Sequence, residues 1–103
     1  MGMISVVLQE EDGKPLAQVN VDTHLLDSLL LETNDERFHS LRFIDLYGDT
    51  VFNRLQMNEF LAEWEMLSER ASTLEQRELL DEVRALASMC RRQPHLYLKF
   101  CGD

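Results

Sequence analysis

Long hydrophobic runs are absent from this sequence. No apolar stretch approaches the roughly 18 residues that a membrane-spanning helix requires, so no membrane span is expected. The first residues also lack the basic and apolar regions of a signal peptide. Met1 and Gly2 are interpreted as a cloning remnant before a native Met3, and the cytoplasm is the expected compartment.

Cysteine is scarce as well. Cys90 and Cys101 are the two cysteines, and no Cys-x-x-Cys pair or close cysteine–histidine cluster has the spacing of a zinc site. Without a secretion signal, we expect reduced thiols rather than a disulfide. A chain of 103 residues is long enough to bury a core without such crosslinks.

Enzyme motifs are missing too. The four glycines are scattered, so the sequence has neither a GxGxxG run nor a Walker-type phosphate loop. His24, His39 and His95 share no helical or strand register, and no nucleophile lies in a recognised catalytic motif. We therefore expect no enzymatic activity and no cofactor.

Basic residues are few: Lys and Arg number 10 against 19 Asp and Glu, which gives a net charge of −9. This charge opposes nucleic-acid binding, which depends on neutralising phosphates, and favours encounter with a basic protein. The acids are concentrated in residues 1–36 and 59–82, whereas residues 37–58 are nearly neutral. High solubility is the alternative explanation for the charge.

The first positive structural signal is a pair of β-favouring segments near the N-terminus. Residues 3–9 are rich in aliphatic side chains, residues 15–21 alternate apolar and polar, and Asp12-Gly13 between them is a strong turn signal. We expect a hairpin whose first strand is the more central and whose second is half-exposed. Leucines at helical spacing then predict a helix near 24–32, capped by Asp22 or Thr23.

A second, central hairpin is predicted around Tyr47-Gly48-Asp49-Thr50. Residues 41–46 and 51–55 flank this turn and are apolar and β-favouring. The alternative is that residues 50–56 are helical and continue into the segment that follows, although Val51 and Phe52 favour a strand.

Two aspartates of this hairpin are weak candidates for a chemical site. Asp45 and Asp49, with His39 nearby, could bind a divalent cation through oxygen or share acid–base work. In the structural alternative, Asp45 pairs with Arg42 or Arg54, and Asp49 only shapes the turn.

Two helices and a final strand follow. Apolar spacing predicts a helix near 59–70, capped by Asn58, with an exposed acidic face of Glu59, Glu63, Glu65 and Glu69. A capping box at Ser72 or Thr73 begins a helix near 74–91, which would pack antiparallel to the first. Its buried residues would be Leu79, Leu80, Val83, Leu86, Ala87 and Cys90. Pro94 ends it, and a strand with Leu96, Leu98 and Phe100 facing inward follows.

The predicted element order is therefore ββ-α-ββ-αα-β. It indicates a single compact domain over residues 3–103 with an α+β fold. The expected sheet is antiparallel or mixed and has about five short strands, with three helices packed on one face.

Residues Phe43–Gln56, FIDLYGDTVFNRLQ, resemble a segment of small, acidic, mostly uncharacterised bacterial proteins. In its single-domain size, acidity and lack of enzyme motifs, the whole chain also resembles the immunity proteins of bacterial toxin systems. That second resemblance implies an inhibitor of a basic toxin and carries over no particular residue.

The favoured interpretation is a protein-binding protein of immunity or inhibitor type. Its acidic surface, which would occlude a basic protein partner, is expected to comprise Glu10, Glu11, Asp12, Glu59 and Glu63. Two alternatives remain open. One is a metal-binding module or small enzyme that uses Asp45 and Asp49; the other is a structural module that buries a sheet edge or the helix pair in a homodimer.

Overall fold

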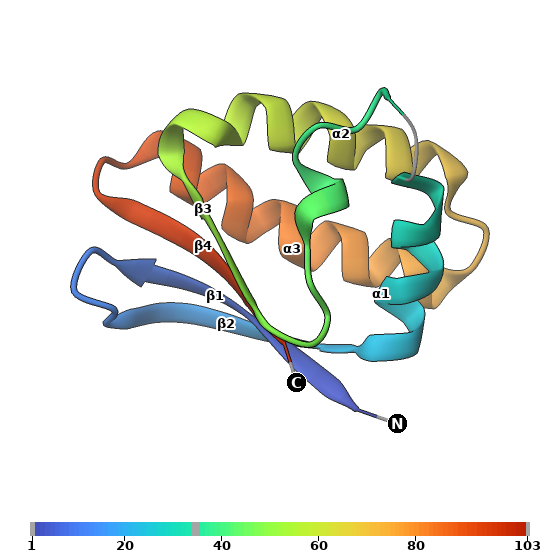
Figure 1. Cartoon of the computed structure of the whole chain (residues 1–103), viewed down its shortest axis with the longest axis horizontal. Coiled ribbons are helices and arrows are strands. Elements are labelled where there is room, and N and C mark those ends of the chain that lie inside the picture. Colours follow the sequence, from blue (N-terminus) through green and yellow to red (C-terminus); the bar gives the residue numbers. More distant parts are fainter. Residues whose placement is uncertain (1, 34–35, 103) are drawn as a thin grey trace.

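The structure is a computed structural model that describes residues 2–33 and 36–102 (Figure 1). Its strands are β1 (Met3–Glu10), β2 (Pro15–Asp22), β3 (Asp49–Asn53) and β4 (Leu96–Cys101). Its α-helices are α1 (Thr23–Leu30), α2 (Met57–Arg70) and α3 (Leu74–Arg92). Short 3₁₀ turns occupy Leu31–Thr33, Leu41–Phe43 and Arg54–Gln56.

The four strands form one antiparallel sheet in the order β2-β1-β4-β3. β1 pairs with β2 through the predicted hairpin, with Val6 opposite Val19. On its other side β1 pairs with β4, where Val6 lies opposite Phe100. The two central strands are thus the first and the last of the strands in the described residues, and β2 and β3 form the edges. The N-terminal hairpin, with a central first strand and a more exposed second strand, is confirmed.

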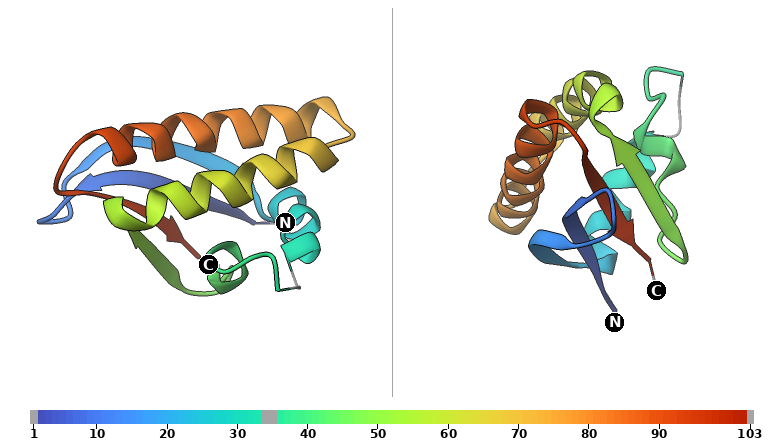
Figure 2. Two further views of the ribbon diagram at one scale, coloured as in Figure 1. Left: turned by 90° about the horizontal axis from the view of Figure 1, so that it is seen from above. Right: turned by 90° about the vertical axis from the view of Figure 1, so that its left-hand side faces the viewer.

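α2 and α3 run side by side across one face of the sheet (Figure 2). The strand side chains that face them are buried, as strand alternation requires; in β4 these are Leu96, Leu98 and Phe100. Phe60 and Trp64 of α2 stack at 5.3 Å between ring centroids, and Phe52 of β3 meets Phe60 edge-on at 5.1 Å. The core therefore lies between the sheet and the helix pair.

The local signals for helix ends are largely confirmed. Asp22 caps α1, and its Oδ1 accepts the Leu25 N–H at 3.0 Å. Thr73 and Gln76 form the predicted capping box of α3, and all six side chains predicted as buried in this helix are buried. The predicted cap of α2, Asn58, was wrong. Asn53 and Gln56 form a capping box that starts a 3₁₀ turn at Arg54, and α2 begins directly after this turn at Met57.

The predicted central hairpin does not form. Residues 41–43 make a 3₁₀ turn, and β3 pairs with β4 instead of with residues 41–46. Leu41 and Ile44 are buried, but they enter the core from an irregular segment whose backbone binds α2. The α+β class is confirmed, with four strands in the described residues rather than about five.

Candidate functional site

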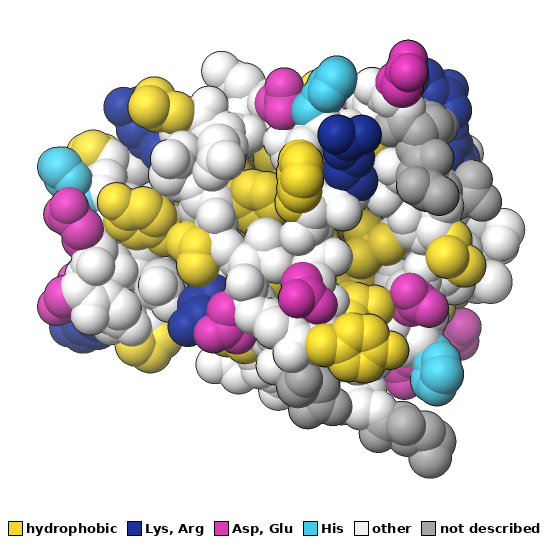
Figure 3. All heavy atoms as spheres, viewed as in Figure 1, with side chains coloured by type: hydrophobic (Ala, Val, Ile, Leu, Met, Phe, Trp, Pro, Cys, Tyr) yellow, Lys and Arg dark blue, Asp and Glu magenta, His cyan; other side chains and the backbone are white. Residues whose placement is uncertain are grey.

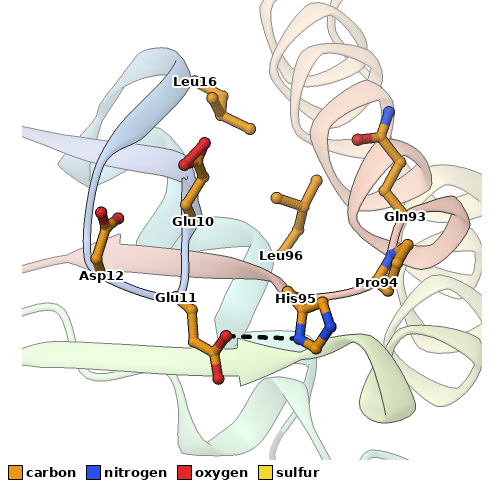
Figure 4. A pocket seen from close by; sticks show the side chains of 8 residues that line it. All are labelled: Glu10, Glu11, Asp12, Leu16, Gln93, Pro94, His95 and Leu96. Atoms are coloured by element: carbon orange, nitrogen blue, oxygen red, sulfur yellow. Dashed lines mark ion pairs between the residues drawn. The ribbon is translucent and has the colours of Figure 1, made fainter.

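An open groove lies at the end of the sheet, between the β1–β2 turn and the connection from α3 to β4 (Figure 4). Its volume is about 520 Å³. Glu10, Glu11, Asp12 and Leu16 line the hairpin side, and Gln93, Pro94, His95 and Leu96 line the other. Two segments that are far apart in the sequence meet here because β1 and β4 are neighbours, with Glu10 opposite Leu96.

The tight turn holds three consecutive carboxylates at the groove. Gly13 has a φ of 92°, which a residue without a side chain adopts without strain. The Gly13 N–H donates to the Glu10 carbonyl at 2.9 Å, and the Glu10 N–H donates to the Lys14 carbonyl at 2.8 Å. Oδ1 of Asp12 accepts the Lys14 N–H at 3.0 Å, so Asp12 both shapes the turn and carries charge.

The opposite wall begins where α3 ends. Gln93 caps the helix through its N–H, which donates to the Met89 carbonyl at 3.2 Å. Pro94 prevents continuation of the helix, and His95 has a φ of 63°. His95 is the non-glycine residue of the described chain with a positive φ, a conformation that costs free energy and is concentrated at functional positions.

Charge in the groove is almost entirely negative. Among the described residues, its lining contains three carboxylates and no Lys or Arg, and its apolar part comes from Leu16, Pro94 and the buried Leu96. Nδ1 of His95 lies 3.5 Å from Oε2 of Glu11, and both side chains are mostly exposed. Such a lining can accept hydrogen bonds from an ammonium or guanidinium group while Leu16 and Leu96 contact its aliphatic stem.

Of the predicted acidic surface, Glu10, Glu11 and Asp12 do come together. Glu59 does not line the groove; it lies near the start of α2, where its Oε1 accepts the Ser40 hydroxyl at 2.7 Å. Glu63 is buried, with 3% of its surface exposed. The expectation that Glu63 belongs to an exposed acidic face was therefore wrong.

The burial of Glu63 has a clear physical reason. Its carboxylate accepts the backbone N–H groups of His39 at 3.0 Å, Ser40 at 3.1 Å and Leu41 at 3.0 Å. Charge-assisted hydrogen bonds of this kind compensate for the loss of hydration. Glu63 thus anchors the irregular segment before β3 instead of offering a charge to a partner.

The two aspartates near the predicted central turn have structural contacts. Oδ1 of Asp45 accepts the Tyr47 N–H at 2.8 Å, and within the described residues no ion pair joins Asp45 to Arg42 or Arg54. Oδ2 of Asp49 lies 3.4 Å from Nζ of Lys99 on the adjacent strand. Asp45 therefore shapes the turn, whereas Asp49 belongs to β3, a division of roles that the sequence did not indicate.

Over residues 2–33 and 36–102, no group of three or more His, Cys, Asp and Glu side chains could hold a metal ion. In the same residues, no helix has the length and apolar character needed to span a membrane. Cys90 is buried, Cys101 is partly exposed, and both are free thiols. Burial raises the pKa of the Cys90 thiol to about 11, although the charge of Arg54 acts in the opposite direction.

No protein-family model, curated protein or solved structure matches the chain.

Sequence reasoning missed the wall formed by Gln93, Pro94 and His95. Pro94 signalled the end of a helix, but nothing in the sequence indicated that this end lies beside the first hairpin. The helix end and the hairpin are neighbours because β1 pairs with β4. The local signal for this wall in the sequence is a histidine, His95, that directly follows the helix-ending Pro94.

Proposed function

We propose that the protein binds a basic protein partner through the groove between the β1–β2 turn and the α3–β4 connection. The proposal rests on the residues that line the groove. They include three carboxylates and an apolar part and, among the described residues, no Lys or Arg. A lysine or arginine side chain of the partner would occupy the groove. The carboxylates would bind its charged end, and Leu16 and Leu96 would pack against its methylenes.

Electrostatics supports this choice of partner. The net charge of −9 attracts a basic surface over distances of about 10 Å at ordinary salt and raises the rate of encounter. The groove adds specificity, because a cation inside it is flanked by carboxylates at close range. The strained backbone of His95 is a further reason for assigning a role to this wall.

The biological role that fits such binding is inhibition by occlusion, of the kind that immunity proteins exert on bacterial toxins. We propose this role on the resemblance in size, acidity and lack of enzyme motifs. We also propose the cytoplasm as the compartment, and two free thiols in one chain suit a reducing environment.

Isothermal titration with the capped peptide Lys-Leu-Arg-Leu-Lys tests the site, since this probe alternates cationic and apolar side chains. The test variant is Glu10→Gln/Glu11→Gln/Asp12→Asn. It removes three charges, and the Asn oxygen can still accept the Lys14 N–H. We expect at least a tenfold loss of affinity, about 1.4 kcal/mol, because each lost charge–charge contact contributes on the order of 0.5 kcal/mol.

The matched control is Glu75→Gln/Glu78→Gln/Glu82→Gln, which removes the same charge from exposed positions of α3. We expect this control to weaken the affinity by less than about threefold, the effect of general attraction alone. Equal losses in both variants would show that binding is diffuse and would contradict the groove. A basic protein encoded by a neighbouring gene should bind most tightly to the parent protein, slightly less tightly to the α3 control and least tightly to the groove variant.

A further inference from the structure

On its outer side, the edge strand β3 has backbone groups that bond to no other strand of the described residues. The Gly102 N–H donates to the Gly48 carbonyl at 2.8 Å, and Asp49 lies opposite Cys101 in the same register. Hydrogen-bonded and non-hydrogen-bonded pairs alternate in antiparallel ladders. Thr50 and Phe52 therefore bond to β4, while the N–H and C=O groups of Asp49 and Val51 and the C=O group of Asn53 point away from it. The Asn53 N–H, on the same outer side, donates to Oε1 of Gln56 at 2.8 Å. The right-hand view in Figure 2 shows β3 at this outer edge of the sheet.

Exposed apolar side chains accompany this edge. Tyr47 is 85% exposed, Val51 is 49% exposed and Leu55 is 80% exposed. They lie before, within and after β3. Figure 3 shows that hydrophobic side chains are spread over the face of the molecule on which this edge lies. An open edge with apolar flanks is a template for pairing with another strand.

The sequence of β3 is complementary to itself in the antiparallel direction. If a two-fold axis passes through Val51, its N–H and C=O groups bond reciprocally with those of Val51 in a second copy. Asp49 then lies opposite Asn53 of the second copy, and the two Asp49 carboxylates stay apart. Tyr47 and Leu55 lie in turns just outside β3, so they flank the paired segment and add exposed apolar surface at its two ends.

Charge favours β3 over the other edge. A shallow pocket beside β2 is lined by Asp22, Glu75, Glu78 and Glu82, and joining two such edges would bring like charges together. At β3, Asp49 is already paired with Lys99. β2 also begins with Pro15, a residue typical of strand edges that are protected from pairing.

We propose that a second copy of this chain docks on the β3 edge, antiparallel and with Val51 at the two-fold axis. One sheet then runs through both copies. The proposal is independent of the acidic groove, which lies at the ends of β1 and β4 and takes a different partner. A homodimer of this kind is isologous, so the contacting surface is the same on both copies.

Sedimentation equilibrium on the full chain tests the proposal from about 5 to about 500 µM, the range in which a modest interface associates. We expect a mass that rises from 12.0 kDa toward twice that value. Val51→Lys should weaken dimerisation at least tenfold, because it places two ammonium groups side by side at the axis. The control Leu16→Lys changes the charge equally on the opposite edge strand and should leave dimerisation unchanged.

Hydrogen exchange followed by NMR locates the interface. The Val51 amide should exchange at least ten times more slowly at the highest concentration than at the lowest, since its N–H gains a partner only in the dimer. The Phe52 amide, bonded to β4 in each copy, should be protected at both concentrations. A monomer at every concentration, a dimer insensitive to Val51→Lys, or a dimer without protection of Val51 would each overturn the proposal.

Discussion

The carboxylate of Glu63 accepts the backbone N–H of Ser40 with both of its oxygens, each at 3.1 Å. The two residues belong to different parts of the chain, α2 and the irregular segment before β3. Because the same carboxylate also binds the N–H groups of His39 and Leu41, one acidic side chain fixes the backbone that precedes β3.

Replacing Glu63 should therefore destabilise the fold without affecting partner binding. We expect Glu63→Ala to lower the free energy of unfolding by about 3 kcal/mol, since buried N–H groups lose a charged acceptor. Glu63→Gln, which keeps one acceptor oxygen, should cost about 2 kcal/mol. Urea titration followed by Trp64 fluorescence measures both.

Glu69→Gln is the matched control, because Glu69 is exposed on the same helix and should change stability by less than about 0.5 kcal/mol. Affinity of Glu63→Gln for the Lys-Leu-Arg-Leu-Lys peptide should equal that of the parent protein to within about twofold. A stability loss no larger than that of the control would contradict the anchoring role.

Cys90 and Cys101 should differ in reactivity. Cys90 is fully buried, its Sγ lies 3.4 Å from the Leu96 carbonyl oxygen, and its pKa is raised to about 11, so at pH 8 it is a shielded, neutral thiol. We expect a disulfide reagent to label Cys101 rapidly in the folded protein and Cys90 only after unfolding in urea. Comparable labelling rates in the folded Cys101→Ser and Cys90→Ala variants would refute this.

The raised pKa of Cys90 also predicts a loss of stability in alkali. Well below pH 9.0, the ordinary pKa of the thiol, Cys90 is protonated in both the folded and the unfolded chain. As pH rises from 9 toward 11, the unfolded chain loses its proton first, so the unfolded state is favoured progressively. The full effect is roughly 3 kcal/mol for two pKa units. The decline of the unfolding free energy over this range should be shallower in Cys90→Ala; identical slopes would contradict it.

Arg91 and Arg92 should weaken the binding of a cation. Both are exposed at the end of α3 and directly precede Gln93 of the groove wall. Within about 10 Å their charge repels a cationic ligand. The double variant Arg91→Gln/Arg92→Gln should bind the basic peptide about threefold more tightly at low salt, with a smaller gain at high salt. Unchanged or weaker binding at low salt in the same titration would argue against an electrostatic groove.

The parts of the fold that were predictable from the sequence rest on local signals. Asp12-Gly13 defines a turn by itself, the Thr73–Gln76 box starts α3 within four residues, and the apolar spacing of α3 identifies its buried face. Each depends on atoms within a few positions along the chain. For these elements the local preference and the final packing agree.

The incorrect predictions have causes that lie far away in the sequence. Residues 41–46 have β-favouring composition, but Glu63 binds the backbone of Leu41 and Ser40 from another element. Glu63 itself falls on the side of α2 that the apolar stripe assigned to solvent. The carboxylates of the groove were found because they are consecutive, whereas its His95 wall depends on which strands are neighbours. The hydrophobic periodicity of a segment does not indicate which distant segment it contacts, and it does not give the order of the strands in the sheet.

A cationic ligand is proposed to occupy the groove beside the β1–β2 turn. The most direct measurement is a ¹H–¹⁵N NMR titration of the ¹⁵N-labelled protein with the capped Lys-Leu-Arg-Leu-Lys peptide. We predict saturable shifts that are concentrated at the amides of Gly13, Leu16, Gln93 and Leu96. These shifts should be lost in Glu10→Gln/Glu11→Gln/Asp12→Asn and retained in Glu75→Gln/Glu78→Gln/Glu82→Gln. Shifts centred on α3, or spread evenly over the acidic surface, would contradict binding in the groove.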